Sequence, residues 1–160
     1  MRTPAIALLI AAADQASKWL VVRHMDLGQS IPVLDGFFRL TYIHNPGAVF
    51  GLRLGGGALH LVVAAVAMAI VGVMLWRLPP SERVARVALA LVLGGAIGNV
   101  IDRVRLGEVI DFLDFGFGDL RWWIFNLADA CVTTGAGLLV LAYGRQRHSG
   151  AEDGVEGLPG

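Results

Sequence analysis

Two aspartates, Asp111 and Asp129, are the residues of this chain whose type and setting could do chemistry. Asp111 stands in an apolar stretch that joins two long apolar segments, and Asp129 stands near the start of the second one. If the joining stretch folds back, two carboxyl groups in an apolar setting cannot both ionise comfortably and tend to share a proton. Such a pair suits an aspartic peptidase, in which one carboxylate activates water and the protonated one polarises the scissile carbonyl. The spacing alone does not bring the two side chains together.

Other polar residues stand within the first apolar segment. Asp14 and Lys18 are four residues apart with the acid first, which favours an ion pair on one helix face and indicates a structural role. Ser17 beside Lys18 suggests a nucleophile and its base, but adjacent residues of a helix do not face each other. We therefore interpret Asp14 and Lys18 as a pair that neutralises itself in the membrane.

Two further polar pairs have a spacing of three residues. Asn99 and Asp102 end the third apolar segment, and Asn126 and Asp129 repeat the spacing in the fourth. Residues three apart share a face of a helix. Gly94 and Gly98 form a small-xxx-small pattern, which is typical of close helix contacts in membranes. A purely structural cluster at the end of the third segment is therefore an equal alternative to a functional one.

Four apolar segments must position these residues: 4–22, 58–76, 84–101 and 122–143. Each is close to the ~20 residues that a helix needs to cross a bilayer, and at this length only helices satisfy their own backbone in lipid. The chain is 56% hydrophobic and 16% charged, whereas a soluble domain is usually about 25% charged. The sequence predicts an all-α membrane protein, a four-transmembrane-helix bundle, with residues 1–143 as one integral membrane domain.

The ends of the first and fourth segments carry two further expectations. Arg2, the apolar run 5–13 and its small-residue end resemble a secretory signal, but the apolar run resumes at 19–22. We therefore expect this segment to be kept as a span. In the fourth span, Asp129 is expected about 10 Å below the membrane surface, at ~1.5 Å per residue from Trp122.

The segments outside the spans differ in character. Residues 31–52 contain the turn signal Asp35-Gly36 and a run rich in aromatic and β-branched types, which predicts a small extracytoplasmic β-element. Residues 144–160 are polar and Gly-rich and predict a disordered cytoplasmic tail. If the N-terminus is cytoplasmic, the inside pieces hold six Arg in 30 residues and the outside pieces six in 55. This bias favours both termini in the cytoplasm.

Composition also bears on partners and cofactors. The 13 basic and 13 acidic residues cancel, which argues against a nucleic-acid partner. Cys131 is the single cysteine, and no Cys/His spacing suggests zinc, so no metal or cofactor is expected. Two other functions compete with a peptidase. A small proton-coupled transporter usually shows internal repeats and broken helices, which are not evident, and a non-enzymatic scaffold does not need this set of acids.

Five motifs occur in order between residues 14 and 129. They are Asp14-Gln15-Ala16-Ser17-Lys18, Asn45-Pro46-Gly47-Ala48-Val49-Phe50-Gly51, Gly94-Gly95-Ala96-Ile97-Gly98-Asn99-Val100-Ile101-Asp102-Arg103, Val109-Ile110-Asp111-Phe112 and Phe125-Asn126-Leu127-Ala128-Asp129. With these motifs the chain resembles lipoprotein signal peptidase, the bacterial type II signal peptidase, an integral membrane aspartic protease. The resemblance covers about three-quarters of the chain.

The resemblance implies an activity and a site. It implies cleavage of prolipoproteins on the amino side of a cysteine that carries diacylglyceryl, in the bacterial inner membrane, with the active site near the outer face. It implies four helices, a β-cradle, a short periplasmic helix, no cofactor or metal, contact with membrane lipids, and inhibition by globomycin. The implied catalytic residues are Asp111 and Asp129, and the implied substrate-binding or supporting residues are Asn45, Asn99, Asp102, Arg103, Asn126, Asp14 and Lys18.

Overall fold

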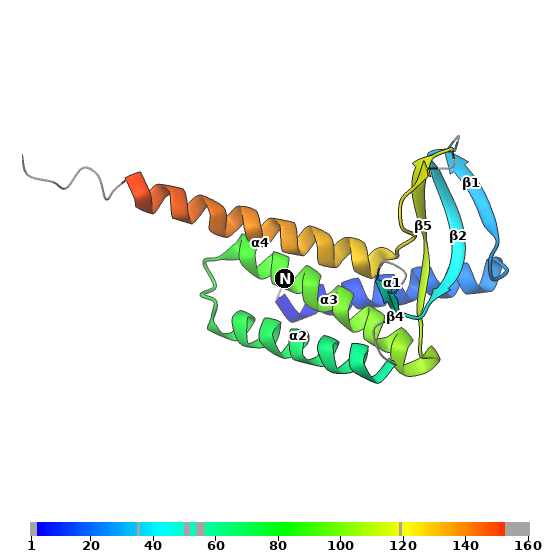
Figure 1. Cartoon of the computed structure of the whole chain (residues 1–160). Coiled ribbons are helices and arrows are strands. Elements are labelled where there is room, and N and C mark those ends of the chain that lie inside the picture. Colours follow the sequence, from blue (N-terminus) through cyan, green and yellow to red (C-terminus); the bar gives the residue numbers. More distant parts are fainter. Residues whose placement is uncertain (1–2, 35, 50–51, 54–56, 119, 153–160) are drawn as a thin grey trace, which may run out of the picture.

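The computed structural model describes residues 3–34, 36–49, 52–53, 57–118 and 120–152. Its helices run side by side, and a curved β-sheet lies across one end of them (Figure 1). The helices are α1 (Thr3–His24), α2 (Gly57–Arg77), α3 (Arg83–Leu106) and α4 (Leu127–Glu152). The strands are β1 (Ser30–Leu34), β2 (Phe38–Asn45), β3 (Ala48–Val49), β4 (Leu52–Arg53), β5 (Val109–Phe117) and β6 (Leu120–Arg121).

Three of the predicted membrane spans correspond to helices of sufficient length and hydropathy. These are α1, the Leu59–Arg77 part of α2, and α3. The apolar part of α4, Leu127–Tyr143, is shorter than a full span, so the predicted fourth transmembrane helix is not confirmed. Together these helices make the chain an integral membrane protein.

The predicted start of the fourth helix is wrong. Residues 122–126 are extended rather than helical, because Phe125 exchanges backbone hydrogen bonds with Leu113 of β5 and the Trp122 amide bonds to the Phe115 carbonyl. The helix begins at Leu127, so Asp129 lies in its first turn and not seven residues inside it. At the other end α4 continues to Glu152, and the tail predicted to be disordered is helical that far. Residues 153–160 lie outside the described residues.

The chain is mostly helical, and the predicted small β-element is present but larger than expected. Four antiparallel strands pair in the order β1-β2-β5-β6. Strand β5 carries Asp111, in a stretch that the sequence analysis interpreted only as a connection between spans, although its alternating aromatic and β-branched residues suit a strand. Pairing of β2 with β5 sets Asn45 opposite Val109 and Ile43 opposite Asp111.

A small hydrophobic core holds this sheet against the end of α1. It consists of the buried side chains Val21, Met25, Tyr42, Ile110 and Phe112. Ile110 and Phe112 flank Asp111 on β5, so their packing fixes the position of Asp111 relative to the end of α1.

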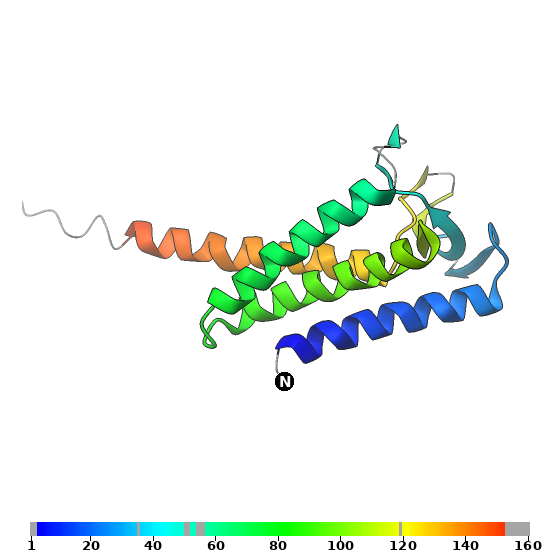
Figure 2. The same ribbon diagram turned by 90° about the horizontal axis from the view of Figure 1, so that it is seen from below.

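Helix α3 lies between its neighbours and packs against α1, α2 and α4 (Figure 2). Glycines allow this close contact: a Cβ on Gly94 would lie 2.6 Å from the Ala7 carbonyl oxygen of α1, and a Cβ on Gly98 would overlap the Asp14 carboxylate. The small-xxx-small pattern is thus a close helix contact, as predicted. A short extra helix is not among the described elements, and residues 50–51 and 54–56, next to β4, lie outside the described residues.

Candidate active site

A buried ionic cluster joins α1 to α3. The Lys18 ammonium lies 2.8 Å from Asp14 Oδ2 and 2.7 Å from Asp102 Oδ2. All three residues are at most 1% exposed. The predicted pair of Asp14 with Lys18 therefore forms, and Asp102, which the sequence placed only near the helix end, is the second acid of the cluster.

Backbone and amide donors satisfy the remaining carboxylate oxygens. Asp14 Oδ1 accepts the Ala128 amide at 2.9 Å, and Asp102 Oδ2 accepts the Ile110 amide at 3.2 Å. Gln15 Nε2 donates to Asp102 Oδ1 at 2.9 Å. Buried charges are stable only with such complete pairing. The cluster therefore ties α1 and α3 to the first turn of α4 and to the start of β5.

Gln15 was not among the residues that the sequence analysis selected. Its side chain contacts Asp102 and also donates to the Gly98 carbonyl at 3.1 Å. A polar residue next to Asp14 in an apolar span was the available signal, because such a residue needs a partner inside the bundle.

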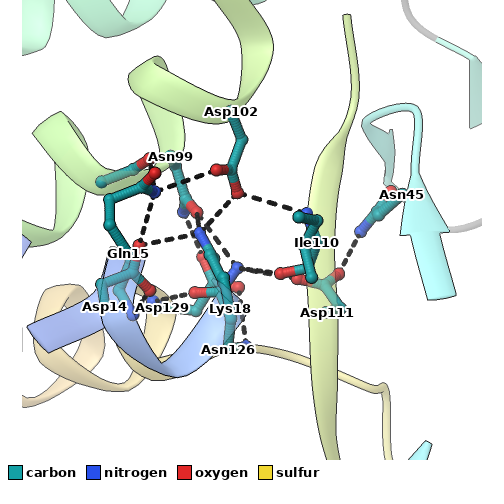
Figure 3. A network of polar contacts seen from close by, with 12 residues as sticks. Asp14, Gln15, Lys18, Asn45, Asn99, Asp102, Ile110, Asp111, Asn126 and Asp129 are labelled. Atoms are coloured by element: carbon teal, nitrogen blue, oxygen red, sulfur yellow. Dashed lines mark hydrogen bonds and ion pairs between the residues drawn. The ribbon is translucent and has the colours of Figure 1, made fainter. Parts of the chain in front are cut away.

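Asn126 links the two candidate catalytic carboxylates (Figure 3). Its Nδ2 donates to Asp111 Oδ1 at 2.7 Å, and its Oδ1 accepts the Asp129 amide at 2.9 Å. Asn126 also donates its own amide to Asp129 Oδ2 at 3.4 Å, which completes a capping box at the start of α4. The three-residue spacing thus places Asn126 and Asp129 at a helix N-terminus, directly beside Asp111.

Asn99 connects this pair to the ionic cluster. Its Nδ2 donates to Asp129 Oδ1 at 2.7 Å, and its Oδ1 accepts the Lys18 ammonium at 3.0 Å. The same Oδ1 accepts Asn126 Nδ2 at 3.0 Å. The position of Asp129 is therefore set from α3 as well as from its own helix.

Asn45 approaches Asp111 from the end of β2. Its Nδ2 donates to Asp111 Oδ2 at 2.9 Å, while its Oδ1 accepts the Gly47 amide at 2.9 Å. Gly47 has φ of 87°, a left-handed conformation that favours glycine, and this tight turn holds the Asn45 amide toward β5. Both oxygens of Asp111 thus accept a side-chain amide.

The electrostatic setting of Asp111 differs from that of an ordinary surface carboxylate. Asp111 is 1% exposed. Burial raises the pKa of its carboxyl to about 6 and the Asp129 charge adds to this, while the hydrogen bonds from Asn45 and Asn126 act in the opposite direction. A carboxyl group with this pKa exchanges its proton near neutral pH, which general acid–base chemistry requires.

Two other polar residues lie apart from the bridged carboxylates. Arg103 is half-buried on α3, and its carbonyl accepts the Gly107 amide at the end of the helix. Within the described residues its guanidinium is not among the groups that bridge Asp111 and Asp129. Asp114 is buried and forms a 2.9 Å ion pair with Arg121, so it belongs to the framework of the sheet.

Within the part of the chain that the structure describes, no group of three or more His, Cys, Asp or Glu side chains could hold a metal ion. The donors that surround Asp111 and Asp129 are amides, which suit carboxyl groups rather than a cation.

Comparison with known proteins identifies the family. The model of the family described as signal peptidase (SPase) II matches residues 6–144. The lipoprotein signal peptidase of Symbiobacterium thermophilum is 46% identical over 138 residues, which cover 85% of this chain and 90% of the relative. That of Geobacter sulfurreducens is 44% identical over 140 residues, which cover 86% and 88%.

Solved structures agree with the sequence relatives. A bacterial membrane enzyme solved at 2.3 Å superposes with a TM-score of 0.82 at 29% identity, over 91% of this chain and 88% of its own. A second, solved at 1.9 Å, gives a TM-score of 0.80 at 30% identity, over 88% and 91%. On the family match and these relatives together, the chain belongs to the signal peptidase II family.

Proposed function

We propose that this chain removes signal peptides from diacylglyceryl-modified prolipoproteins, cutting on the amino side of the lipidated cysteine by an aspartic mechanism. The relatives named lipoprotein signal peptidase support the substrate class. The observation that carries the mechanism is the Asn126 side chain, which contacts Asp111 and the Asp129 amide at once.

The reaction needs one carboxylate and one carboxylic acid. The carboxylate takes a proton from water as its oxygen attacks the scissile carbonyl carbon, and the acid gives its proton to the carbonyl oxygen. Collapse of the tetrahedral intermediate breaks the carbon–nitrogen bond: the carboxyl group that took the proton from water gives it to the cysteine nitrogen, and the other carboxylate regains its proton from a hydroxyl of the intermediate as the carbonyl re-forms. We assign these two roles to Asp111 and Asp129 as a pair, because Asn126 contacts both residues.

The surrounding amides position the two acids for this exchange. Asn45 and Asn126 direct their donors at the Asp111 oxygens, and Asn99 directs one at Asp129. Such preorganised donors stabilise charge without rearranging during the reaction. Asp14, Lys18 and Asp102 act as structural support, and for Arg103 a supporting role rests on the family resemblance alone. No cofactor or metal takes part.

The arrangement of the elements supports the orientation that we propose in the membrane. Helix α1 begins, and α4 ends, away from the sheet (Figure 1). Asp111 stands on strand β5 of the sheet, and Asp129 stands in the first turn of α4. We place both termini in the cytoplasm and the site at the outer face of the bacterial inner membrane. There a cysteine anchored by its lipid presents its peptide bond. Globomycin is the inhibitor that the family resemblance implies.

The deciding experiment is cleavage in a purified system. Reconstituted protein is incubated with a diacylglyceryl prolipoprotein, with its unlipidated form as control, and the released signal peptide is followed by gel and mass spectrometry. Release from the lipidated form alone supports the proposal. Proton uptake by sealed vesicles without any cleavage would favour a proton-coupled transporter instead.

A further inference from the structure

The far end of the sheet presents aromatic side chains to the outside. Phe117 is 72% exposed, Leu120 81%, Trp122 68% and Trp123 64%. With Phe37 and Phe115 they line a cavity of about 540 Å³. These six residues are called the aromatic patch below. Soluble proteins rarely expose apolar patches of more than a few hundred Å², so a patch of this kind marks an interaction surface.

The charged residue that also lines this cavity, Arg121, is paired with an acid of the sheet. Arg121 donates to Asp114 Oδ1 at 3.0 Å and to the Asp114 carbonyl at 3.0 Å. The Asp114 carboxylate also accepts the Thr41 hydroxyl at 2.8 Å, inside the sheet. Because the guanidinium is paired with a buried acid, the patch itself presents rings and aliphatic carbon.

The position of the aromatic patch relates it to the lipid-facing helices. The sheet crosses the ends of the helices, and the end of β5 reaches beyond α4 (Figure 1). The chain returns from that end through Trp122 and Trp123 and enters α4 at Leu127. Tryptophan next to a membrane helix is typical of the membrane–water interface, where its ring is apolar and its N–H meets polar groups.

From these observations we infer that the aromatic patch sits in the outer lipid leaflet and that acyl chains of bilayer lipids occupy its cavity. The patch continues the apolar surface of the membrane helices past the end of the bundle. The other candidate occupant, the lipid of the substrate, is attached beside the scissile bond and hence near Asp111. Asp111 and Phe117 are six residues apart on β5, about 20 Å at ~3.4 Å per residue.

This contact has a consequence for the catalytic site. Asp111 stands on the same strand as Phe115 and Phe117 of the aromatic patch, so lipid contact at the patch constrains the depth of Asp111 relative to the bilayer. The patch then sets the depth at which the carboxylate pair meets a membrane-anchored peptide bond. The inference requires membrane insertion of the chain but not its peptidase chemistry.

Site-directed spin labelling tests the inference without any cleavage assay. A nitroxide is attached to Leu120→Cys, and separately to Phe117→Cys, in the full chain carrying Cys131→Ser. The protein is reconstituted without substrate in vesicles of phosphatidylethanolamine and phosphatidylglycerol. The matched control is Asp26→Cys, at an exposed turn beyond the end of α1. Collision with oxygen, which concentrates in lipid, is compared with collision with a water-soluble nickel chelate.

The expected ratio of oxygen to nickel accessibility is several-fold higher at both patch positions than at Asp26. Equal ratios at the three positions would overturn the inference. A ratio that rises at the patch positions only after a lipidated prolipoprotein is added would also overturn it, because the patch would then be a substrate site. A high ratio that falls when the protein is diluted in lipid would also overturn it, because the patch would then contact a second copy of the chain and not lipid.

Discussion

Asn126 and Asp129 cap the first turn of α4 reciprocally: Asn126 Oδ1 accepts the Asp129 amide at 2.9 Å, and Asp129 Oδ2 accepts the Asn126 amide at 3.4 Å. The Asn126 amide group, at the same time, contacts Asp111. One side chain therefore serves the stability of α4 and the geometry of the carboxylate pair, and substitutions can separate the two roles.

Comparing Asn126→Ser with Asn126→Ala should separate capping from positioning. Both variants lose the buried amide, but serine caps a helix about as well as asparagine, so Asn126→Ser should be more stable than Asn126→Ala by ~0.5–2 kcal/mol. Both variants lack the amide that donates to Asp111, so we expect both to lose most of their cleavage rate. Thermal unfolding and single-turnover cleavage measure the two effects. Full activity in Asn126→Ser would show that the contact with Asp111 is dispensable.

The pH dependence of stability should report the burial of Asp111. Its folded-state pKa of about 6 lies above the ordinary value of 3.8. A raised folded-state pKa contributes stability that is present below pH 4 and is lost as the pH rises to about 6. The shift corresponds to on the order of 3 kcal/mol, at about 1.4 kcal/mol per unit.

The matched comparison is Asp111→Asn, which cannot ionise. Between pH 4 and pH 7 the free energy of unfolding of the natural chain should fall relative to that of Asp111→Asn. Asp26→Asn, at an exposed carboxylate on the same side of the molecule, should leave the pH profile unchanged. Parallel profiles for the natural chain and Asp111→Asn would mean that Asp111 is not buried as described.

The ionic cluster should matter for folding more than for turnover. Lys18→Ala leaves Asp14 and Asp102 without their shared cation, and breaking a buried ion pair typically costs ~3–5 kcal/mol. We therefore expect poor yield and a lower unfolding temperature, with turnover per folded molecule largely kept. Normal yield with an activity loss equal to that of a change at Asp129 would assign the cluster to the chemistry.

A change at Asp114 tests whether a buried acid of the sheet stabilises the fold or takes part in catalysis. It is acidic and lies three residues from Asp111 on the same strand, but it is paired with Arg121. Asp114→Asn should lower stability by ~1–3 kcal/mol, since a buried donor loses its charged partner, and should keep turnover per folded molecule. An activity loss as large as that of Asp111→Asn, at equal folded fraction, would argue that acidity near the outer face matters in general and not only at Asp111 and Asp129.

Local spacing predicted part of this structure well. The four-residue interval between Asp14 and Lys18 forms an ion pair because helix geometry alone decides which side chains are neighbours. Glycines at 94 and 98 likewise meet α1 closely. These features depend on one helix or on one helix contact, which periodicity describes.

Features that depend on contacts between distant segments could not be predicted from the sequence. Residues 122–125 are all aromatic or aliphatic, as membrane helices often are, but the segment pairs with Leu113 and Phe115 of β5 and is extended. Hydropathy could not distinguish the two states, so α4 was started too early and Asp129 placed too deep. The contacts of Gln15 and Asn99 cross between helices, and no interval in the sequence encodes them.

The central claim is that Asp111 and Asp129 act as one catalytic unit. The most direct measurement is the cleavage rate of a diacylglyceryl prolipoprotein by Asp111→Asn, by Asp129→Asn and by the double variant, with Asp26→Asn as the control and folding checked for each. An acid–base role is typically worth about 10²–10⁴ in rate, and residues of one unit are not additive. Each single variant should therefore lose at least about 10²-fold, the double should be scarcely slower than either, and Asp26→Asn should match the natural chain. Substantial cleavage by either single variant, or losses that multiply in the double, would contradict a shared-proton pair.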